Sequence, residues 1–226
     1  MPVPPGAAGA RAAEPRRGRR GAGAVMAGPG EFGSRPLTPE NWADLEYLFG
    51  LPGGSIVRGC WCMAYRRTGT PPEVAISPAA VRAASKQAMC DLVGSGVVPG
   101  LIGYLDGVAA GWISFGPREE YLKLRRSPIM KPVDDTPVWS VVCSYVAKPH
   151  RGQGLQRRLL AAAIEYAREN GATVMEAYPV DKAERSHPDF MFFGSRSLYE
   201  RAGFREVVRR SPTRVVMRRE LDSSPA

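Results

Sequence analysis

The chain has 226 residues, a formal net charge of +9 and 44% hydrophobic residues, an ordinary composition for a globular protein with a sizeable core. No apolar run approaches the roughly 20 residues that cross a bilayer, and the N-terminus lacks the compact apolar region of a secretory signal. The four cysteines, Cys60, Cys62, Cys90 and Cys143, lack the spacing of a disulfide framework. We therefore expect a cytoplasmic protein with reduced thiols rather than a membrane protein or a disulfide-stabilised secreted one.

The N-terminal segment differs in composition from the rest of the chain. Residues 1–35 consist mainly of Pro, Gly, Ala and Arg, and six arginines against Glu14 and Glu31 give them a charge of +4. With so few large apolar groups, residues 1–35 are predicted to be disordered, as is the tail 221–226. One folded domain is expected between them, over residues 36–220. Basic residues are not interleaved with stacking aromatics along one face, so no nucleic-acid partner is expected.

The first half of the domain predicts two helices and a hairpin. Thr38 and Pro39 are a typical helix start, and Gly50 is a typical helix end. Ser77 and Pro78 open a second helix that runs to about Val93. Two apolar runs, 101–104 and 108–115, are separated by Asp106-Gly107, a strong signal for a hairpin. A polar connection over residues 116–137 follows.

The second half contains the most informative stretch, a strand followed by a glycine-containing basic turn and a long amphipathic helix. Residues 138–147 are rich in β-branched and aromatic residues and predict a central strand that stops before Pro149. A helical apolar stripe runs from Gln153 onward, and Gly171 is a typical helix end. Further strands are predicted at 173–178, 205–210 and 214–219, with a loop over 181–195 and a short helix over 197–201. This order indicates a mixed α+β or α/β domain around one twisted sheet.

Two blocks of the second half carry a family resemblance. The run from Tyr145 to Leu160, YVAKPHRGQGLQRRLL, resembles the acyl-CoA signature of the GNAT superfamily of N-acetyltransferases, in which Arg or Gln is followed at fixed spacing by Gly and then by Gly or Ala. Arg151 and Gly154 match that signature, whereas Gln156 stands where Gly or Ala is usual. The block from Ser197 to Phe204, SLYERAGF, resembles the tyrosine-bearing helix of the same superfamily.

The resemblance covers about residues 36–220, most strongly from Val138 onward, and it implies the fold. In that fold a mostly antiparallel sheet has two central strands splayed apart around the acyl-CoA site. Here those strands would be 138–147 and 173–178, with the pantetheine arm between them.

The predicted cofactor site follows from the turn before the helix. Backbone N–H groups at a helix N-terminus attract anions and can form a nest for the diphosphate, with charge added by Arg151 or Arg157. The free edge of the strand near Tyr145 and Val146 can pair with the pantetheine amides, and the resemblance makes the Val146 N–H an oxyanion donor. The predicted cofactor-binding residues are Tyr145, Val146, Arg151, Gly152, Gln153, Gly154, Leu155, Gln156 and Arg157.

Two residues are predicted for proton transfer. Tyr199, mainly through the resemblance, is the expected general acid for the leaving thiolate, because a phenol with a pKa near 10 matches an alkyl thiol. Glu176, in the middle of its strand, is the predicted general base, and a water relay is the alternative. The acidic residues of the connection before the central strand could instead neutralise a cationic substrate or be solvated: Glu119, Glu120, Asp134 and Asp135.

Metal and cysteine chemistry are not expected. Cys60 and Cys62 lack the second ligand pair of a structural zinc site, so a buried cluster of thiols with Trp61 is favoured. Neither His150 nor His187 has a spacing that would make Cys143 a nucleophile. Phe190-Met-Phe-Phe193 could line an acceptor pocket or cap the core, and core capping is preferred.

The sequence therefore predicts an acetyl-CoA-dependent N-acetyltransferase that acetylates a primary amine of a small molecule by direct attack in a ternary complex. Outside residues 1–35 the chain carries the other +5 of its net charge, which suits a polyanionic cosubstrate. Two alternatives stay open: a sensor or scaffold module that binds acyl-CoA without turnover, and an acyltransferase that depends on an acyl carrier protein. No metal, membrane or nucleic acid is expected, and a homodimer is left open.

Overall fold

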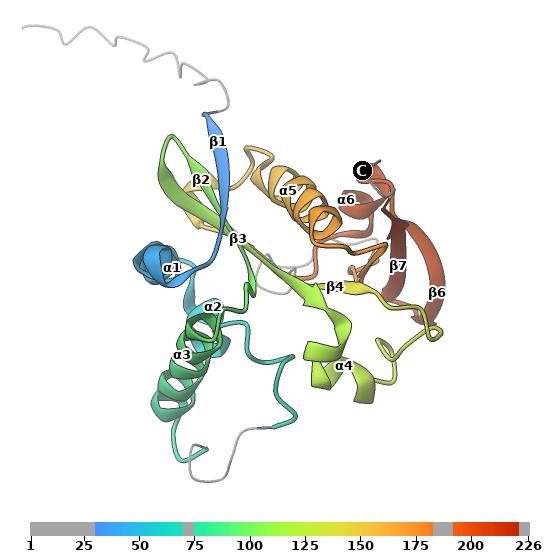
Figure 1. Cartoon of the computed structure of the whole chain (residues 1–226), viewed down its shortest axis with the longest axis horizontal. Coiled ribbons are helices and arrows are strands. Elements are labelled where there is room, and N and C mark those ends of the chain that lie inside the picture. Colours follow the sequence, from blue (N-terminus) through green and yellow to red (C-terminus); the bar gives the residue numbers. More distant parts are fainter. Residues whose placement is uncertain (1–29, 70–74, 183–191, 222–226) are drawn as a thin grey trace, which may run out of the picture.

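The computed structural model describes residues 30–69, 75–182 and 192–221, and their strands form one sheet (Figure 1). The order across the sheet is β1-β2-β3-β4-β5-β7-β6. Neighbouring strands are antiparallel except β4 and β5, which are parallel. The predicted fold class, mixed α/β with one mostly antiparallel sheet, is confirmed. The strands are β1 (Phe32–Pro36), β2 (Gly100–Leu105), β3 (Val108–Pro117), β4 (Trp139–Val146), β5 (Val174–Ala177), β6 (Arg205–Ser211) and β7 (Arg214–Glu220).

The helices cover both faces of the sheet. Helix α5 packs against β1, β2, β3 and β4, whereas α1 packs against β3 and, together with α2 and α3, forms the other layer. Leu101 and Ile102 are neighbours on β2 and point to opposite faces, into these two separate hydrophobic cores. The α-helices are α1 (Trp42–Gly50), α2 (Ser55–Cys60), α3 (Pro78–Gly94), α4 (Leu122–Arg126), α5 (Leu155–Glu169) and α6 (Arg196–Arg201), and the 3-10 turns are η1 (Pro39–Asn41), η2 (Arg118–Glu120) and η3 (Lys148–His150).

Helix α5 approaches the sheet very closely, and two glycines make this possible. A Cβ atom added at Gly103 would lie 2.8 Å from Leu159 Cδ2, and one at Gly111 would lie 2.8 Å from Leu159 Cδ1. Real Cβ atoms do not pack at such distances, so a larger residue at either position of β2 or β3 would require Leu159 to shift. The fully buried Leu159 thus fixes how deep the first turn of α5 sits.

Strands β4 and β5 separate soon after they meet. They pair only at Trp139 with Met175, Ser140 with Glu176 and Val141 with Ala177. Farther along β4, the Ser144 N–H donates to the carbonyl oxygen of Phe192 at 2.6 Å instead of to β5. The sheet is therefore open next to the end of β4, as the resemblance implies.

The structure adds elements that the sequence pattern did not predict. Strand β1 includes Phe32–Arg35, which composition had assigned to the disordered segment 1–35, and Leu221, assigned to the tail, is buried in the core. Helices α2 and α4 are also additions to the prediction. The helix predicted to start at Pro39 is instead the 3-10 turn η1 followed by α1. Residues 1–29 and 222–226 lie outside the described part.

Candidate active site

The turn between β4 and α5 has an open, ligand-accessible backbone. Gly152 and Gly154 have φ values of 81° and 72°, and nothing lies within 4 Å of a Cβ atom added at either one. Gly154 is the N-cap of α5. Within the described residues, the N–H groups of Gly152–Gln156 have no backbone or side-chain acceptor. Such a turn at the positive end of a helix dipole suits an anion.

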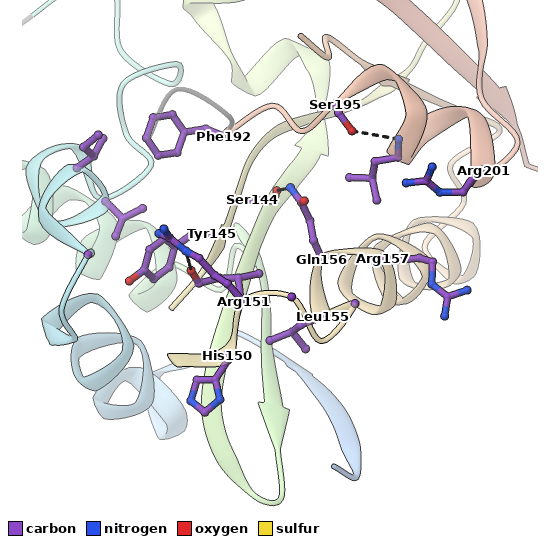
Figure 2. A pocket seen from close by; sticks show the side chains of 17 residues that line it. Ser144, Tyr145, His150, Arg151, Leu155, Gln156, Arg157, Phe192, Ser195 and Arg201 are labelled. Atoms are coloured by element: carbon purple, nitrogen blue, oxygen red, sulfur yellow. Dashed lines mark hydrogen bonds between the residues drawn. The ribbon is translucent and has the colours of Figure 1, made fainter. Parts of the chain in front are cut away.

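This turn forms one side of a cavity of about 700 Å³ (Figure 2). The end of β4 and the first turn of α5 form its wall, with α2 and Phe192 on one side and α6 on the other. All of the residues predicted to bind the cofactor line it except Gln153. The residues that the prediction missed are Gly53, Ile56, Val57, Ser144, His150, Phe192, Ser195, Leu198 and Arg201.

The end of β4 offers one backbone donor to this cavity. N–H groups of successive strand residues point to alternate edges of a strand. The Ala147 N–H donates to Ala110 O on β3, and the Ser144 N–H points the other way, to Phe192. The Val146 N–H therefore points to the open side, where the sequence places a pantetheine or oxyanion contact. The Val146 carbonyl accepts a hydrogen bond from Arg151 Nε at 3.0 Å, which holds the arginine side chain against the strand.

Gln156 departs from the family signature, and the structure shows where its side chain goes. Its Nε2 donates to Ser144 Oγ at 2.5 Å, so the amide spans from the first turn of α5 to β4 (Figure 2). The carbonyl of Phe192 already binds the Ser144 N–H. Gln156 therefore occupies the floor of the gap between the splayed strands.

Tyr199 lies in the core next to the cavity rather than among its lining residues. It is 1% exposed, and its ring packs edge-on against Phe204 with centroids 5.1 Å apart. A Cβ atom added at Gly194 would lie 3.1 Å from Tyr199 Cε2 and 3.5 Å from Gln156 Nε2, so the ring edge is close to the cavity floor. Burial raises the pKa of the Tyr199 phenol, with a smaller effect from the nearby Cys143 thiol.

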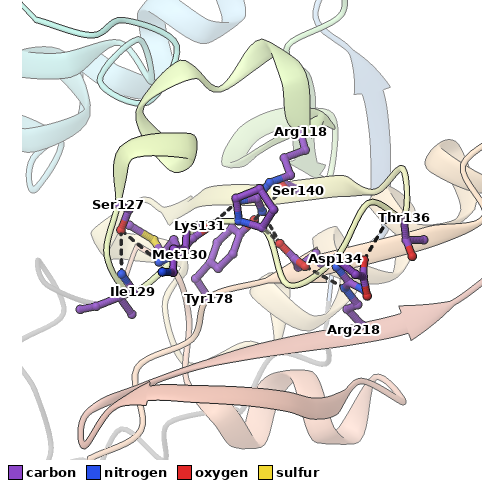
Figure 3. Close-up of polar contacts among 12 residues, drawn as sticks. Arg118, Ser127, Ile129, Met130, Lys131, Asp134, Thr136, Ser140, Tyr178 and Arg218 are labelled. Carbon is purple, nitrogen blue, oxygen red and sulfur yellow. Dashed lines mark hydrogen bonds and ion pairs between the residues drawn. The ribbon is translucent and has the colours of Figure 1, made fainter.

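Glu176 belongs to a polar cluster with Arg118, Tyr178 and Arg218, and Figure 3 labels these three partners. It is fully buried and does not line the cavity. Its carboxylate is ion-paired with Arg118 and accepts a bond from Arg218 Nε at 2.8 Å. It also accepts a hydrogen bond from the Tyr178 hydroxyl at 2.6 Å. Two arginines occupy this carboxylate, and it lies away from the cavity, so the geometry gives Glu176 a bracing role and does not bring it to the predicted catalytic position.

The other acidic candidates do not line the cavity either. Glu120 is ion-paired with Arg66, and Asp134 accepts a bond from Arg218 at 2.7 Å. The bond from Arg218 is the main cause that lowers the pKa of Asp134. No carboxylate contributes to the wall of the cavity within residues 30–69, 75–182 and 192–221.

Two of the thiols, Cys62 and Cys143, belong to a buried cluster with aromatic rings. Cys62 Sγ accepts a hydrogen bond from Trp112 Nε1 at 3.2 Å, and Cys62 and Cys143 share a core with Trp61 and Phe49. The described cysteines are all free thiols, and no group of three or more His, Cys, Asp or Glu side chains in the described residues could hold a metal ion. Of the run Phe190–Phe193, Phe192 lines the cavity and Phe193 is core; the other two lie outside the described residues.

Comparison with known proteins decides the family. Residues 66–204 match the family model described as Acetyltransferase (GNAT) family. The chain belongs to the GNAT acetyltransferase family. The match spans α3 to α6, and so includes both the open turn before α5 and the helix that carries Tyr199. None of the described helices of this GNAT protein is long and apolar enough to cross a membrane.

Solved structures resemble this GNAT chain at low identity. A GNAT-family protein from Desulfovibrio desulfuricans is 17% identical, with a TM-score of 0.49 over 85% of this chain and 100% of that one. The yncA protein of Salmonella typhimurium, solved with its cofactor acetyl-CoA, is 20% identical, with a TM-score of 0.46 over 86% and 96%. The paia N-acetyltransferase of Thermoplasma acidophilum, solved with coenzyme A, is 14% identical, with a TM-score of 0.47 over 84% and 99%. No curated protein matches the chain.

Proposed function

We propose that this protein is an acetyl-CoA-dependent N-acetyltransferase that acetylates a primary amine of a small molecule by direct attack in a ternary complex. The observation that carries the proposal is the cavity in which the open N–H groups of Gly152–Gln156 meet the unpaired end of β4. A diphosphate suits the turn, and an amide-bearing arm suits the strand edge. The glycines leave the room that such a ligand needs.

In this proposal, residues of the chain bind the acetyl thioester, orient it and protonate the departing sulfur. The acetyl thioester supplies an activated carbonyl, and the Val146 N–H donates a hydrogen bond to its oxygen as negative charge develops there. Tyr199, kept protonated by its burial, delivers a proton to the departing sulfur. With Glu176 held in ion pairs, the proton of the amine passes to water.

The cavity end near α2 is where the acceptor binds in this proposal. Ile56, Val57 and Phe192 line it, which favours an amine with an apolar body. Arg157 lies at the other end, next to α6 (Figure 2), whereas the Arg151 guanidinium lies close to Gly53, just before α2.

A second candidate function is an acyl-CoA-binding sensor without turnover. One observation favours it: the predicted base is neutralised, and no carboxylate lines the cavity in the described residues. The third reading, dependence on an acyl carrier protein, predicts activity only with a thioester that is bound to a carrier protein.

The test combines binding and turnover on the full chain. Titration calorimetry with CoA and acetyl-CoA should show saturable binding, and a thiol-release assay with a panel of amines should show acceptor-dependent release from acetyl-CoA. Binding without release on any amine would favour the sensor. Absence of binding to either ligand would overturn both functions.

A further inference from the structure

The side chain of Arg151 leaves the turn before α5 and points toward the α2 end of the cavity. Its Nε donates to the Val146 carbonyl at 3.0 Å, and a Cβ atom added at Gly53 would lie 3.6 Å from its Nη2. Figure 2 shows this side chain well separated from Arg157 and Arg201, which lie on the α6 side. One nitrogen therefore fixes the guanidinium on β4, and its terminal nitrogens lie at the end where the acceptor binds in our proposal.

The charge of this guanidinium has no counterion in the described part of the protein. Within residues 30–69, 75–182 and 192–221, the bond to Val146 is the only hydrogen bond of the Arg151 side chain, and no carboxylate lines the cavity. Arg151 is partly buried, and a charge that is removed from water is costly unless it is paired. A carboxylate can supply that pair, because its two oxygens match the planar guanidinium.

The surroundings of the guanidinium define what else the bound molecule carries. Gly53 has φ 87° and no side chain that could cover the terminal nitrogens of Arg151. The apolar side chains of Ile56, Val57 and Phe192 line the same end of the cavity. A second ammonium group would find a cation there instead of a carboxylate. The site therefore suits an anionic group next to an apolar group and disfavours a diamine.

Val146 connects this anion site to the proposed chemistry. The N–H and C=O groups of one strand residue point to the same edge. Arg151, bound to the Val146 carbonyl, is thus next to the N–H that is the proposed oxyanion donor. A carboxylate on Arg151 would hold an amine on the adjacent carbon close to the thioester. We infer that the acceptor is an α-amino acid with an apolar side chain. The inference rests on the proposed function and adds the substrate class to it.

Matched acceptors test the inference on the full chain. The thiol-release assay with acetyl-CoA compares L-phenylalanine, L-leucine, L-isoleucine, L-valine and L-methionine with their amides and with the corresponding amines that lack the carboxyl group. The kcat/KM of the best amino acid should exceed those of its two analogues about ten- to hundredfold, because hydrogen bonds to a charged group contribute that much. The amine of an amino acid amide titrates at about pH 8, so at neutral pH nucleophilicity alone favours the amide.

Arg151→Gln tests the residue itself. The variant lacks the charge, so its preference for the carboxylate should disappear, mainly through a higher KM for the amino acid, while its affinity for acetyl-CoA in calorimetry stays within about twofold. Arg58→Gln is the control, because Arg58 is exposed on α2 and does not line the cavity. This control should keep the full preference.

Gly53 offers a second variant that leaves the bond between Arg151 and Val146 in place. Asp and Asn both tolerate positive φ, so Gly53→Asp and Gly53→Asn share the same backbone strain. Only the aspartate brings a carboxylate within reach of the guanidinium. Gly53→Asp should therefore lose the preference for amino acids, and Gly53→Asn should keep it.

Three results would overturn the inference and leave the proposed function intact. The first is wild-type turnover of amines without a carboxylate that equals or exceeds that of the matched amino acids, and this comparison needs no variant. The second is an unchanged preference in both Arg151→Gln and Gly53→Asp. The third is retained preference with lost acetyl-CoA affinity in Arg151→Gln, which would assign the guanidinium to a phosphate of the cosubstrate. Absence of acceptor-dependent release with every amine would instead contradict the proposed function.

Discussion

At the scale of single residues, Tyr199 illustrates how packing sets the protonation of a side chain. Its hydroxyl belongs to a ring enclosed by Phe204 and the core under α5. Burial disfavours the phenolate and raises the pKa above the ordinary value near 10. A protonated donor is therefore present throughout the neutral range, next to the cavity floor.

Tyr199→Phe should lower the turnover number by about a hundredfold or more, because positioned acid catalysis contributes that much, while CoA affinity stays within about twofold. Steady-state kinetics and calorimetry measure the two quantities. Tyr47→Phe, at a 52% exposed tyrosine on α1, is the control and should change neither. Unchanged turnover in Tyr199→Phe would remove the residue from the chemistry.

The raised pKa also predicts a pH profile. Tyr199 acts as an acid only when its phenol is protonated. Because its pKa is raised, its contribution to turnover is present at low and neutral pH and is lost only as the pH rises through the raised value. The turnover number of the wild type should therefore not fall through ionisation of this residue at about pH 10, where an ordinary tyrosine titrates. A decline centred there that is absent in Tyr199→Phe would contradict this assignment.

Glu176 offers the opposite case, a charged group used for stability. Its removal leaves Arg118 buried without its carboxylate, and breaking a buried pair costs about 3–5 kcal/mol. Glu176→Gln should lower the free energy of unfolding in urea by that amount. Glu165→Gln, at an exposed ion pair on α5, should change it by less than about 1 kcal/mol. A variant with wild-type stability but no turnover would restore Glu176 to the proposed chemistry as the base.

At the scale of elements, the sequence predicted well where a long periodic pattern met clear end signals. The stretch from β4 to α5 is such a case, because its buried stripe includes Leu155, Leu159 and Ile164, and glycines stand at both ends. The hairpin β2–β3 was equally clear from Asp106-Gly107. The cofactor side of the candidate site follows from this one stretch.

Short or irregular elements were harder to predict. Strand β1 is only five residues long with a Gly-Ser-Arg centre, and its existence depends on pairing with β2, far along the chain. Helix α2 has six residues and ends at Trp61 in a left-handed conformation (φ 46°), which tryptophan rarely adopts. The ion pairs of Glu176 could not be predicted, because the two arginines come from positions 118 and 218 and no local pattern reveals that encounter.

The close packing of α5 on the hairpin predicts a strong effect of a single methyl group. Gly111→Ala places a Cβ atom 2.8 Å from Leu159 Cδ1 and 3.2 Å from Tyr145 O, so it should lower the free energy of unfolding by about 1–3 kcal/mol. Gly33→Ala on β1, where nothing lies within 4 Å, is the control and should be neutral. Urea denaturation measures both, and equal stabilities would contradict the packing described.

At the scale of the whole molecule, the limits of the domain can be tested by truncation. Strand β1 pairs with β2 along its length, and Phe32 packs against the core. A chain that begins at Gly30 should melt at the same temperature as the full chain, because residues 1–29 contribute few large apolar groups. A chain that begins at Leu37 lacks β1 and should melt at least about 4 °C lower. Thermal denaturation distinguishes these outcomes, and a drop already at Gly30 would place the N-terminal limit earlier.

The short parallel contact between β4 and β5 has a consequence for how the molecule responds to its ligand. It divides the sheet into two halves, β1–β4 and β5–β7, that share three residue pairs and the cluster around Glu176. The cavity opens at the unjoined end of that seam, with β4 on one side and α6 on the other. A molecule bound there contacts both halves of the sheet and restricts their relative motion. Amide exchange should therefore slow on ligand binding well beyond the residues that the ligand contacts.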